Sequence, residues 1–348
     1  MVSYTIRLSP KESTLSSLWR TKNMSNPLRC LVLGGRGFIG SHLVDALLEE
    51  GNHVRCFGRS HGVSLTNTNC IQIHNKNFEM FEGDLMSEAD ITEALQGCDI
   101  CFHLVSTTQP KSSNADPIFD VESNVSGTIK LLNQAVKAGV KKVIFTSSGG
   151  TVYGVPVRIP ITEEHPNNPT CSYGITKLAI EKYLGLFHTL HGLEYSILRI
   201  SNPFGERQRT HATQGAVAVF LSKALRGETI EIWGDGSVVR DYIYIKDVIS
   251  ALIAVSKYSG PERVFNIGSG IGISLNEVLN AIEKITQQST IRHYVKGRSF
   301  DVPVSILSIE KAKLILHWSP KTTFEEGLDH FSKWIEKQIQ NEKACHSQ

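Results

Sequence analysis

The feature that most constrains the fold of this chain is a glycine-rich turn between an apolar stretch and an amphipathic one. Residues 34–40 read Gly-Gly-Arg-Gly-Phe-Ile-Gly. They follow the apolar residues 30–33 and lead into residues 38–48, where apolar side chains recur at helical spacing. Glycine lets a backbone approach a ligand closely, and a helix N-terminus offers unpaired N–H groups and a positive dipole end to phosphate oxygens. Such a run alone also suits an ordinary flexible turn, but the flanking strand and helix favour a dinucleotide site.

The composition is that of a globular protein and excludes several classes of partner. The chain has 348 residues, of which 41% are hydrophobic and 20% charged, and its net charge is +2. This charge gives no reason to expect a nucleic-acid or membrane partner. No continuous apolar run reaches the roughly 18 residues of a membrane-spanning helix.

The cysteines and the N-terminal segment give information about the cellular compartment of the protein. Cys98 and Cys101 have a spacing known from metal and redox sites, but they begin an apolar run and are interpreted as small buried residues. We therefore predict reduced thiols and a cytoplasmic protein. Residues 1–27 are interpreted as a disordered extension; a transit-like segment before Met24 is the alternative. The histidines form no close set with carboxylates, so we expect no metal.

Apolar runs alternate with amphipathic stretches up to about residue 201, which predicts α/β architecture. The expected fold is a Rossmann-type doubly wound parallel sheet with a smaller, partly interleaved C-terminal substrate-binding lobe. Strands are predicted at 30–33, 53–57, 78–82, 100–105, 143–147 and 195–200, and helices near 38–50, 88–96, 121–138 and 173–191. Ser87, three residues before Asp90, resembles a capping box. The lobe is predicted to contain helices at 216–225, 274–286 and 323–338 and strands at 229–233, 242–245 and 264–267, with another sheet-covering helix at 247–256.

These elements suggest two domains. Residues 28–202 form the predicted dinucleotide-binding domain and 203–340 mainly the substrate-binding lobe, with 243–270 returning to the first domain and 341–348 as a tail. The cleft between the two is the default substrate site.

Tyr173 and Lys177 are the candidate catalytic pair. They are four residues apart on a predicted helix, so both side chains project from one face. An ammonium close to a phenol stabilises the phenolate and lowers the pKa of the phenol from about 10. Tyr173 is therefore a candidate acid or base for interconverting a hydroxyl and a carbonyl. This spacing also occurs by chance on solvated helix faces, and it gains meaning from the glycine turn before it.

Six motifs in order resemble the extended short-chain dehydrogenase/reductase superfamily. Within it the chain is similar to the nucleotide-sugar epimerase/dehydratase family, closest to UDP-glucose 4-epimerase-like members, over about residues 29–338. The motifs are Gly34-x-x-Gly37-x-x-Gly40, Gly83-Asp84-Leu85, Asn124-Val-Ser-Gly-Thr128, Ser147-Ser148-Gly-Gly-Thr-Val-Tyr153-Gly, Tyr173-x-x-x-Lys177 and Arg240-Asp241-Tyr242.

The resemblance implies roles for individual residues. Cofactor-binding residues would be Gly34, Gly37, Phe38, Ile39 and Gly40 at the pyrophosphate, Asp84 and Leu85 at the adenine, and Arg59, Leu104, Val105, Asn124, Ser147, Tyr173 and Lys177 elsewhere. Lys177 would bind the nicotinamide ribose and lower the pKa of Tyr173. Asn202, Arg240 and Arg298 would hold the diphosphate of a nucleotide sugar, with Asp301 near the nucleoside ribose. Arginine suits this because it offers bidentate hydrogen bonds to phosphate; an ion pair of Arg240 with Asp235 or Asp241 is the alternative.

Three positions depart from the family pattern. Gly149 stands where the family usually has a Ser or Thr that binds the reacting sugar oxygen, so Ser148, Thr151 or a water must substitute. Gly58, followed by Arg59, replaces the acidic residue that selects NAD through the ribose hydroxyls, which leaves NADP open. Leu33 replaces a Thr before the first glycine and is expected to matter little.

The resulting hypothesis is a nucleotide-sugar 4-epimerase for UDP-hexoses or UDP-N-acetylhexosamines, with bound NAD as hydride carrier and Tyr173 as acid/base. The alternatives are an NADP-dependent 4-keto-sugar reductase, a 4,6-dehydratase and a non-enzymatic dinucleotide-binding protein. The dehydratase is disfavoured because Gly150-Thr151 replaces the acidic pair of that branch, and a non-enzymatic member would typically lack the Tyr or the Lys.

The resemblance also implies a homodimer through residues 121–138 and 173–191. His42 is expected to pack beside the glycine turn, and Trp233 and Phe204 to stack on a nucleobase or to pack in the core or cleft.

Overall fold

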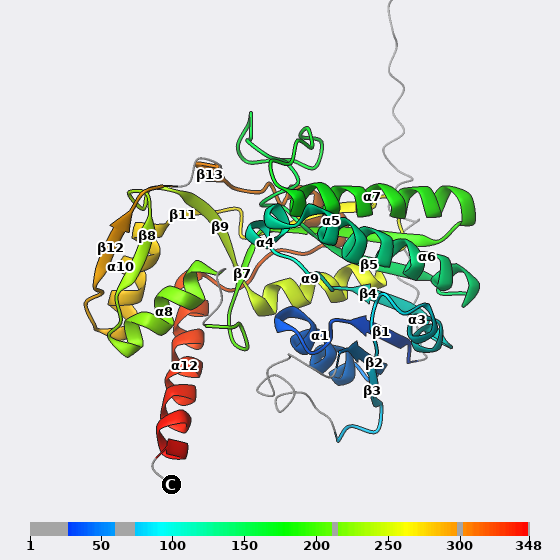
Figure 1. Cartoon of the computed structure of the whole chain (residues 1–348), viewed down its shortest axis with the longest axis horizontal. Coiled ribbons are helices and arrows are strands. Elements are labelled where there is room, and N and C mark those ends of the chain that lie inside the picture. The colour runs from blue at the N-terminus through cyan, green and yellow to red at the C-terminus, as the bar shows by residue number, and fades with distance from the viewer. Residues whose placement is uncertain (1–26, 60–73, 211–214, 298–301, 347–348) are drawn as a thin grey trace, which may run out of the picture.

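The computed structural model describes residues 27–59, 74–210, 215–297 and 302–346, which form a large sheet covered by helices and a smaller lobe beside it (Figure 1). The strands of the large sheet are β1 (Arg29–Leu33), β2 (His53–Gly58), β3 (Phe78–Glu82), β4 (Ile100–His103), β5 (Lys142–Ser148), β6 (Glu194–Ile200) and β10 (Val264–Ile267). The helices around it are α1 (Phe38–Glu49), α3 (Glu88–Leu95), α4 (Pro110–Ala115), α5 (Pro117–Asp120), the π-helical turn η1 (Val121–Ser126), α6 (Gly127–Lys137), α7 (Ser172–His191) and α9 (Ile245–Lys257).

The large sheet is parallel throughout, in the order β10-β6-β5-β4-β1-β2-β3. Successive side chains of a strand point to opposite faces. Cys30 and Val32 of β1 therefore belong to the core under α1 and α9, and Leu31 and Leu33 to the core under α3, α6 and α7. A strand buried on both faces reads as a continuous apolar run. The predicted Rossmann-type α/β fold is thus confirmed.

The order of the strands fixes where the glycine turn lies. β1 pairs with β2 on one side and with β4 on the other, so the chain winds outward from β1 in both directions. In such a sheet the loops that follow the two central strands diverge and leave a crevice at the carboxyl ends, where ligands bind. The glycine turn follows β1, and Leu104 and Val105 follow β4.

The smaller lobe is built around strand β9. Its elements are β7 (Asn202–Phe204), α8 (Ala216–Arg226), β8 (Ile230–Trp233), β9 (Val239–Tyr244), β11 (Gly272–Ser274), α10 (Leu275–Thr286), β12 (Arg292–Val295), β13 (Val304–Ser305) and α12 (Phe324–His346). β9 pairs with β7, β11 and β13, while β12 pairs with β8. Three elements in the lobe's part of the sequence belong to the large sheet instead: α9 packs on α1, β5 and β6, β10 is an edge strand, and α11 (Glu310–Leu316) packs on β10 and α9.

The structure differs from the predicted elements at a few places. β4 ends at His103 rather than at residue 105, and Ile245 begins α9 rather than ending a strand. The stretch predicted as one helix from 121 begins as the π-helical turn η1, and such turns are frequent at functional sites. α12 continues to His346, beyond the predicted end near 338. Ser87 caps α3 by accepting from the Asp90 N–H, but the Asp90 carboxylate accepts from the Asp84 N–H, so the box is not reciprocal.

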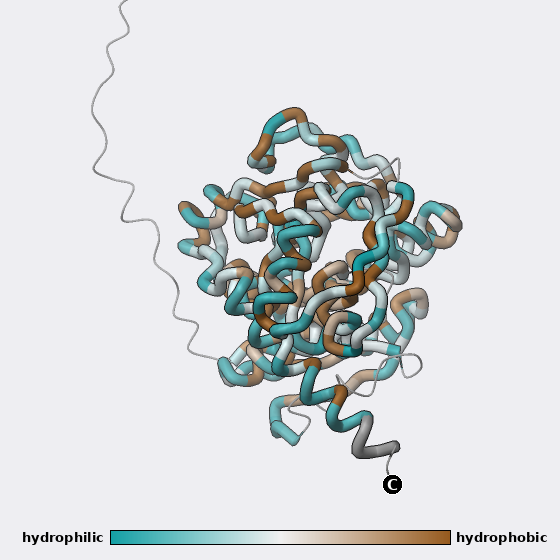
Figure 2. The backbone as a smooth tube through the Cα atoms, turned by 90° about the vertical axis from the view of Figure 1, so that its left-hand side faces the viewer, coloured by the Kyte–Doolittle hydropathy of each residue, from teal (hydrophilic) through white to brown (hydrophobic). Residues whose placement is uncertain are grey.

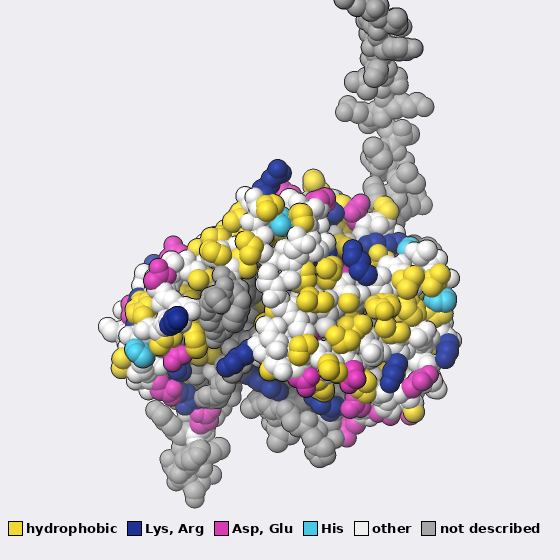
Figure 3. Space-filling model, turned by 45° about the horizontal axis from the view of Figure 1, so that its top comes forward, with side chains coloured by type: hydrophobic (Ala, Val, Ile, Leu, Met, Phe, Trp, Pro, Cys, Tyr) yellow, Lys and Arg dark blue, Asp and Glu magenta, His cyan; other side chains and the backbone are white. Residues whose placement is uncertain are grey.

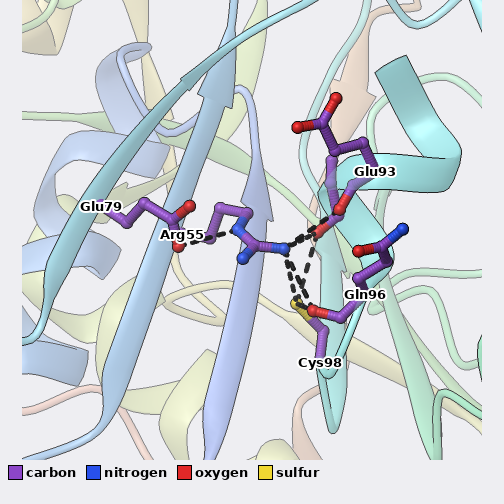
Figure 4. Close-up of polar contacts among 6 residues, drawn as sticks. Arg55, Glu79, Glu93, Gln96 and Cys98 are labelled. Atoms are coloured by element: carbon purple, nitrogen blue, oxygen red, sulfur yellow. Dashed lines mark hydrogen bonds and ion pairs between the residues drawn. The ribbon is translucent and has the colours of Figure 1, made fainter. Parts of the chain in front are cut away.

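Cys98 lies in a structural cluster around Arg55 of β2 (Figure 4). Nη1 of Arg55 donates to the carbonyl oxygens of Ala94 (2.7 Å) and Gln96 (3.1 Å) at the C-terminus of α3. A cation interacts favourably with the negative end of the helix dipole there. Nε of Arg55 pairs with Glu79 at 2.9 Å. Cys98 is 4% exposed and Cys101 fully buried, both as free thiols. The interpretation of both as small buried residues is confirmed.

The loop that joins β5 to α7 projects from the top of the molecule in Figures 1 and 2. It carries apolar side chains into solvent, and Val157 is 84% exposed. Ile161 anchors this loop through a bridge to Leu307. None of the described helices is long and apolar enough to cross a membrane.

Candidate functional site

The glycine turn has the shape of a phosphate cradle. Gly34 has φ +82°, a left-handed conformation that side chains disfavour, and a Cβ on Gly40 would overlap the Gly34 carbonyl oxygen. Gly37 is the N-cap of α1 and makes no side-chain capping bond. The three glycines therefore place no side chain in front of the first N–H groups of α1, from Phe38 and Ile39 onward. A pyrophosphate group fits this turn.

The ends of β2, β3 and β4 lie around the turn as predicted for an adenosine-binding edge. Asp84 is exposed just after β3, whereas Leu85 is only 5% exposed and packs in the core. A Cβ on Gly34 would approach Val105 Cγ2 at 3.2 Å, and Leu104 N–H donates to Leu33 (3.1 Å). At the end of β2, Arg59 is exposed, while Arg36, which sequence reasoning missed, lies against Gly58.

Tyr173 and Lys177 lie on the first turns of α7, on one face as predicted. Lys177 Nζ donates to the Thr146 carbonyl (3.0 Å) and lies 5.6 Å from the centre of the Tyr173 ring. Burial lowers the pKa of Lys177 to about 8, against the opposing charges of Asp120 and Glu181. Burial also raises the pKa of Tyr173 to about 12. The prediction that Lys177 brings the pKa of Tyr173 toward neutrality is therefore wrong for the protein without ligand, because desolvation of the phenol dominates.

α4 holds the first turn of α7 in place. The N-cap of α7 is Cys171, whose side chain makes no capping bond. Instead Asn114 Oδ1 accepts from the N–H of Ser172 (2.9 Å), and Ser113 Oγ accepts from the N–H of Tyr173 (3.0 Å). The position of Tyr173 thus depends on a helix far away in the sequence, which pattern reasoning could not detect.

Asp120 is a second functional candidate that sequence reasoning missed. Its carboxylate is fully buried and accepts from Ser172 Oγ (2.7 Å) and Thr176 Oγ1 (3.3 Å) of α7, from the amide of Asn124 (2.9 Å) and from the hydroxyl of Thr108. Asn124, predicted to support the cofactor region, also accepts from the Thr107 N–H at 3.0 Å. Asp120 therefore joins α7 to the loop after β4. The sequence held one indication of this role: Asp120 lies four residues before Asn124, about one helical turn away.

Ser147 belongs to a buried polar network rather than to an open surface. Its hydroxyl donates to Glu181 (2.5 Å), whose carboxylate pairs with Arg199 at 2.6 and 3.1 Å. The guanidinium also lies 4.8 Å from the centre of the Tyr153 ring. Glu181 follows Lys177 by one helical turn, so this network places a negative charge behind the Lys177 ammonium.

The structure explains why position 149 is a glycine. A Cβ there would meet Leu307 Cδ1 at 2.5 Å and the Arg199 carbonyl at 3.2 Å, so a Ser or Thr does not fit without a shift. Thr151 lies in the following loop, beside Gly174 of α7, and its Oγ1 is buried with no partner among the described residues. A buried hydroxyl without a partner is costly unless a ligand or water completes it. Between the two predicted substitutes, this favours Thr151 over the half-buried Ser148.

Asn202 and Arg240 line one cavity of about 440 Å³ between β8, β9, α8 and α4. Asn202 Nδ2 donates to the Asp241 carbonyl (3.0 Å), and Arg240 Nη1 donates to the Val302 carbonyl (2.6 Å). The carboxylate of Asp241 accepts from Ser269 and Gly270. Arg298 and Asp301 lie outside the described residues.

Other residues in and near the cavity differ in their exposure and their contacts. Trp233 lines the cavity and is 41% exposed, whereas Phe204 is 1% exposed and packs on Tyr244 and Phe324. Lys111 reaches the cavity from α4, the helix that fixes Tyr173. The His42 ring packs against Phe38 and bonds to the Glu206 carbonyl (2.9 Å), which agrees with a packing role beside the turn.

Residues 30–268 match the model of the NAD dependent epimerase/dehydratase family. The chain belongs to this family. It is 36% identical over 303 residues to a UDP-glucose 4-epimerase of Mycolicibacterium smegmatis, covering 86% of the chain and 96% of that protein. It is 32% identical over 319 residues to a dTDP-4-dehydro-6-deoxyglucose reductase of Escherichia coli, covering 88% and 96%. The crystal structure of the Thermotoga maritima UDP-glucose 4-epimerase with UDP-glucose has 36% identity and a TM-score of 0.84, covering 90% of this chain and 100% of that one.

These matches confirm the predicted family, its NAD cofactor and the class of NAD-dependent nucleotide-sugar epimerases. The roles of individual site residues, the homodimer and the cytoplasmic location stay predictions.

Proposed function

We propose that this protein is a nucleotide-sugar 4-epimerase that acts on UDP-hexoses or UDP-N-acetylhexosamines. The observation that carries the proposal is the placement of Tyr173 and Lys177 on a helix whose first turn is fixed by α4. α4 also contributes Lys111 to the cavity lined by Asn202 and Arg240. One helix, α4, therefore connects the candidate proton-transfer pair to a cavity that offers a cation and an amide to a diphosphate.

The chain's residues have distinct tasks in this reaction. Asn202 and Arg240 bind the diphosphate. The roles predicted for Arg298 at the diphosphate and for Asp301 at the nucleoside ribose stay predictions. Tyr173 takes the proton of the C4 hydroxyl and returns it after the 4-keto sugar has rotated in the site. Thr151, or Ser148, binds the C4 oxygen. Lys177 holds the nicotinamide ribose. When bound, NAD would supply the hydride chemistry at C4, and the positive charge of its oxidised nicotinamide would favour the phenolate form of Tyr173.

The direct test supplies UDP-galactose and UDP-N-acetylgalactosamine and follows the gluco epimers by chromatography. We expect interconversion without added reductant and without net formation of NADH, because the hydride returns to the same sugar. Absence of turnover with both sugars, in protein shown to contain NAD, would contradict the proposal.

Thr151→Val is expected to lower kcat by about 10- to 100-fold, because the variant keeps the shape and loses one hydrogen bond to the reacting oxygen. Ser148→Ala is the matched control and should cost less than about fivefold. Steady-state kinetics of both variants checks this. The opposite order would assign the contact to Ser148.

Arg240→Ala is expected to raise KM by about 30- to 150-fold, equivalent to about 2–3 kcal/mol, through loss of a charge-assisted bond to the diphosphate. Calorimetry with UDP, which lacks the hexose, should show a similar loss. Arg240→Lys keeps the charge and should lose less. Unchanged UDP affinity in the Ala variant would place the diphosphate elsewhere.

A second candidate is the NADP-dependent 4-keto-sugar reductase, favoured by the match to the Escherichia coli reductase and by Gly58 at the end of β2. Mass spectrometry of the nucleotide that co-purifies separates the two. Bound NAD supports the epimerase, whereas an empty site that fills with NADPH and consumes it with a 4-keto sugar supports the reductase.

We also propose a homodimer through α7 and the segment around η1. Ile175, Leu186 and Leu190 of α7 are 54%, 46% and 63% exposed, and Ile118 and Phe119 of α5 are 72% and 49% exposed. Hydrophobic side chains gather on this face in Figure 3. Contiguous exposed apolar surface of this kind marks an interface. The apolar residues begin in α5, slightly before the predicted stretch.

The expected result is a dimer in sedimentation velocity at micromolar concentration. Leu186→Glu together with Leu190→Glu should yield a folded monomer, because each partner would bury uncompensated carboxylates. Leu314→Glu, at a 75% exposed position on α11, is the control and should stay dimeric. A wild-type monomer would contradict the homodimer.

A further inference from the structure

Arg36 occupies the corner between the glycine turn and the end of β2. Its side chain folds over Gly58, where an added Cβ would lie 3.6 Å from Arg36 Cδ. Nη1 donates to the Arg59 carbonyl at 3.2 Å. Arg36 is only 8% exposed, whereas Arg59 is exposed. Arg36 and not Arg59 therefore holds its guanidinium in a fixed place beside the turn.

The hydrogen bonds of this guanidinium are incomplete. Nε of Arg36 is buried and has no acceptor among the described residues. The ion pair with Glu82 is long, at 3.9 Å, and the Glu82 side chain is 60% exposed. The contrast is Arg199, which is also buried and pairs bidentately with Glu181 at 2.6 and 3.1 Å. A buried cation with an unmatched donor is suited to receive an anion.

The residue opposite, Gly58, brings no carboxylate to this corner. A carboxylate at the end of the second strand binds both hydroxyls of the adenosine ribose and repels a 2′-phosphate. We propose that Arg36 forms a subsite for the 2′-phosphate of NADP, so that the glycine turn accepts NADP(H) in addition to NAD. Glu82 weakens the subsite but does not close it, because its carboxylate is mostly solvated. The inference depends on the dinucleotide fold and not on the identity of the sugar.

The test is calorimetric titration of nucleotide-free protein with adenosine 2′,5′-bisphosphate and with 5′-AMP, which differ only in the 2′-phosphate. Wild type should bind the bisphosphate at least about tenfold more tightly, a difference of about 1.4 kcal/mol. Arg36→Ala should remove this preference and leave 5′-AMP binding within about threefold, which also shows that the turn is intact. Arg59→Ala is the matched control and should keep most of the preference. Arg36→Lys should keep part of it, since the charge remains.

Gly58→Asp gives an independent arm, because the backbone leaves ordinary contact distance for a side chain there. The new carboxylate should pair with Arg36 and lower bisphosphate affinity at least tenfold without weakening 5′-AMP. Equal binding of the two nucleotides by wild type would overturn the proposal, as would loss of the preference in Arg59→Ala but not in Arg36→Ala. Failure of wild type to bind either nucleotide would overturn it too, whereas inactivity toward UDP-sugars with the preference intact would contradict only the proposed function.

Discussion

Tyr173→Phe is expected to lower kcat by about 10²- to 10⁴-fold while leaving NAD and UDP affinity nearly unchanged. The variant removes one hydroxyl from a ring whose position is set by α4 and by Lys177 beneath it. Positioned acids and bases contribute rate factors of this size. In the protein without ligand the pKa of Tyr173 is raised to about 12, so the hydroxyl is protonated at neutral pH. Tyr173 must therefore lose this proton before it can take the proton of the C4 hydroxyl.

The measurements are steady-state kinetics with UDP-galactose, calorimetry with UDP and the NAD content of the purified variant. Tyr183→Phe is the matched control, because Tyr183 lies on the same helix and packs against the apolar core. It should keep nearly full activity. A Tyr173→Phe enzyme with more than about a tenth of wild-type kcat would remove Tyr173 from the proton-transfer role.

Arg199→Leu is expected to destabilise the fold by about 3–5 kcal/mol. Arg199 and Glu181 have side chains 4% and 3% exposed, so removing one partner leaves a buried carboxylate whose remaining described partner is Ser147. Breaking a buried pair from one side carries this cost because the other charge stays desolvated and unpaired. Urea unfolding followed by circular dichroism measures the free energy of unfolding.

The double variant Arg199→Leu with Glu181→Leu is the informative comparison. It removes both charges, so it should be more stable than Arg199→Leu alone, and the non-additivity measures the coupling. It should still be less active than wild type, because Glu181 raises the pKa of Lys177 against the effect of burial. A loss below about 1 kcal/mol in Arg199→Leu would mean that water reaches Glu181.

The parts of the site that lie on one element could be predicted. The glycine turn with its strand and helix is local, and so is the four-residue spacing that puts Tyr173 and Lys177 on one face of α7. The predicted positions of the seven strands of the large sheet agree with the structure to within two residues at either end. The inner strands β1 and β4 are buried on both faces and leave continuous apolar runs. The prediction that Arg59 lies beside the ribose stays a prediction, and the arginine side chain that contacts Gly58 in the structure is that of Arg36.

The sequence by itself determined the sheet, the glycine turn between β1 and α1, and the shared helix face of the candidate pair Tyr173 and Lys177, since backbone sterics and side-chain periodicity act over a few residues. Tertiary structure alone decided which groups surround that pair. Ser113 and Asn114 cap α7 from another helix, Asp120 joins α7 to Asn124, and Glu181 of α7 pairs with Arg199 of β6. Burial in that setting also reversed the predicted shift in the pKa of Tyr173. These contacts join residues distant in the chain, and desolvation depends on everything packed around a group, so no local pattern encodes them.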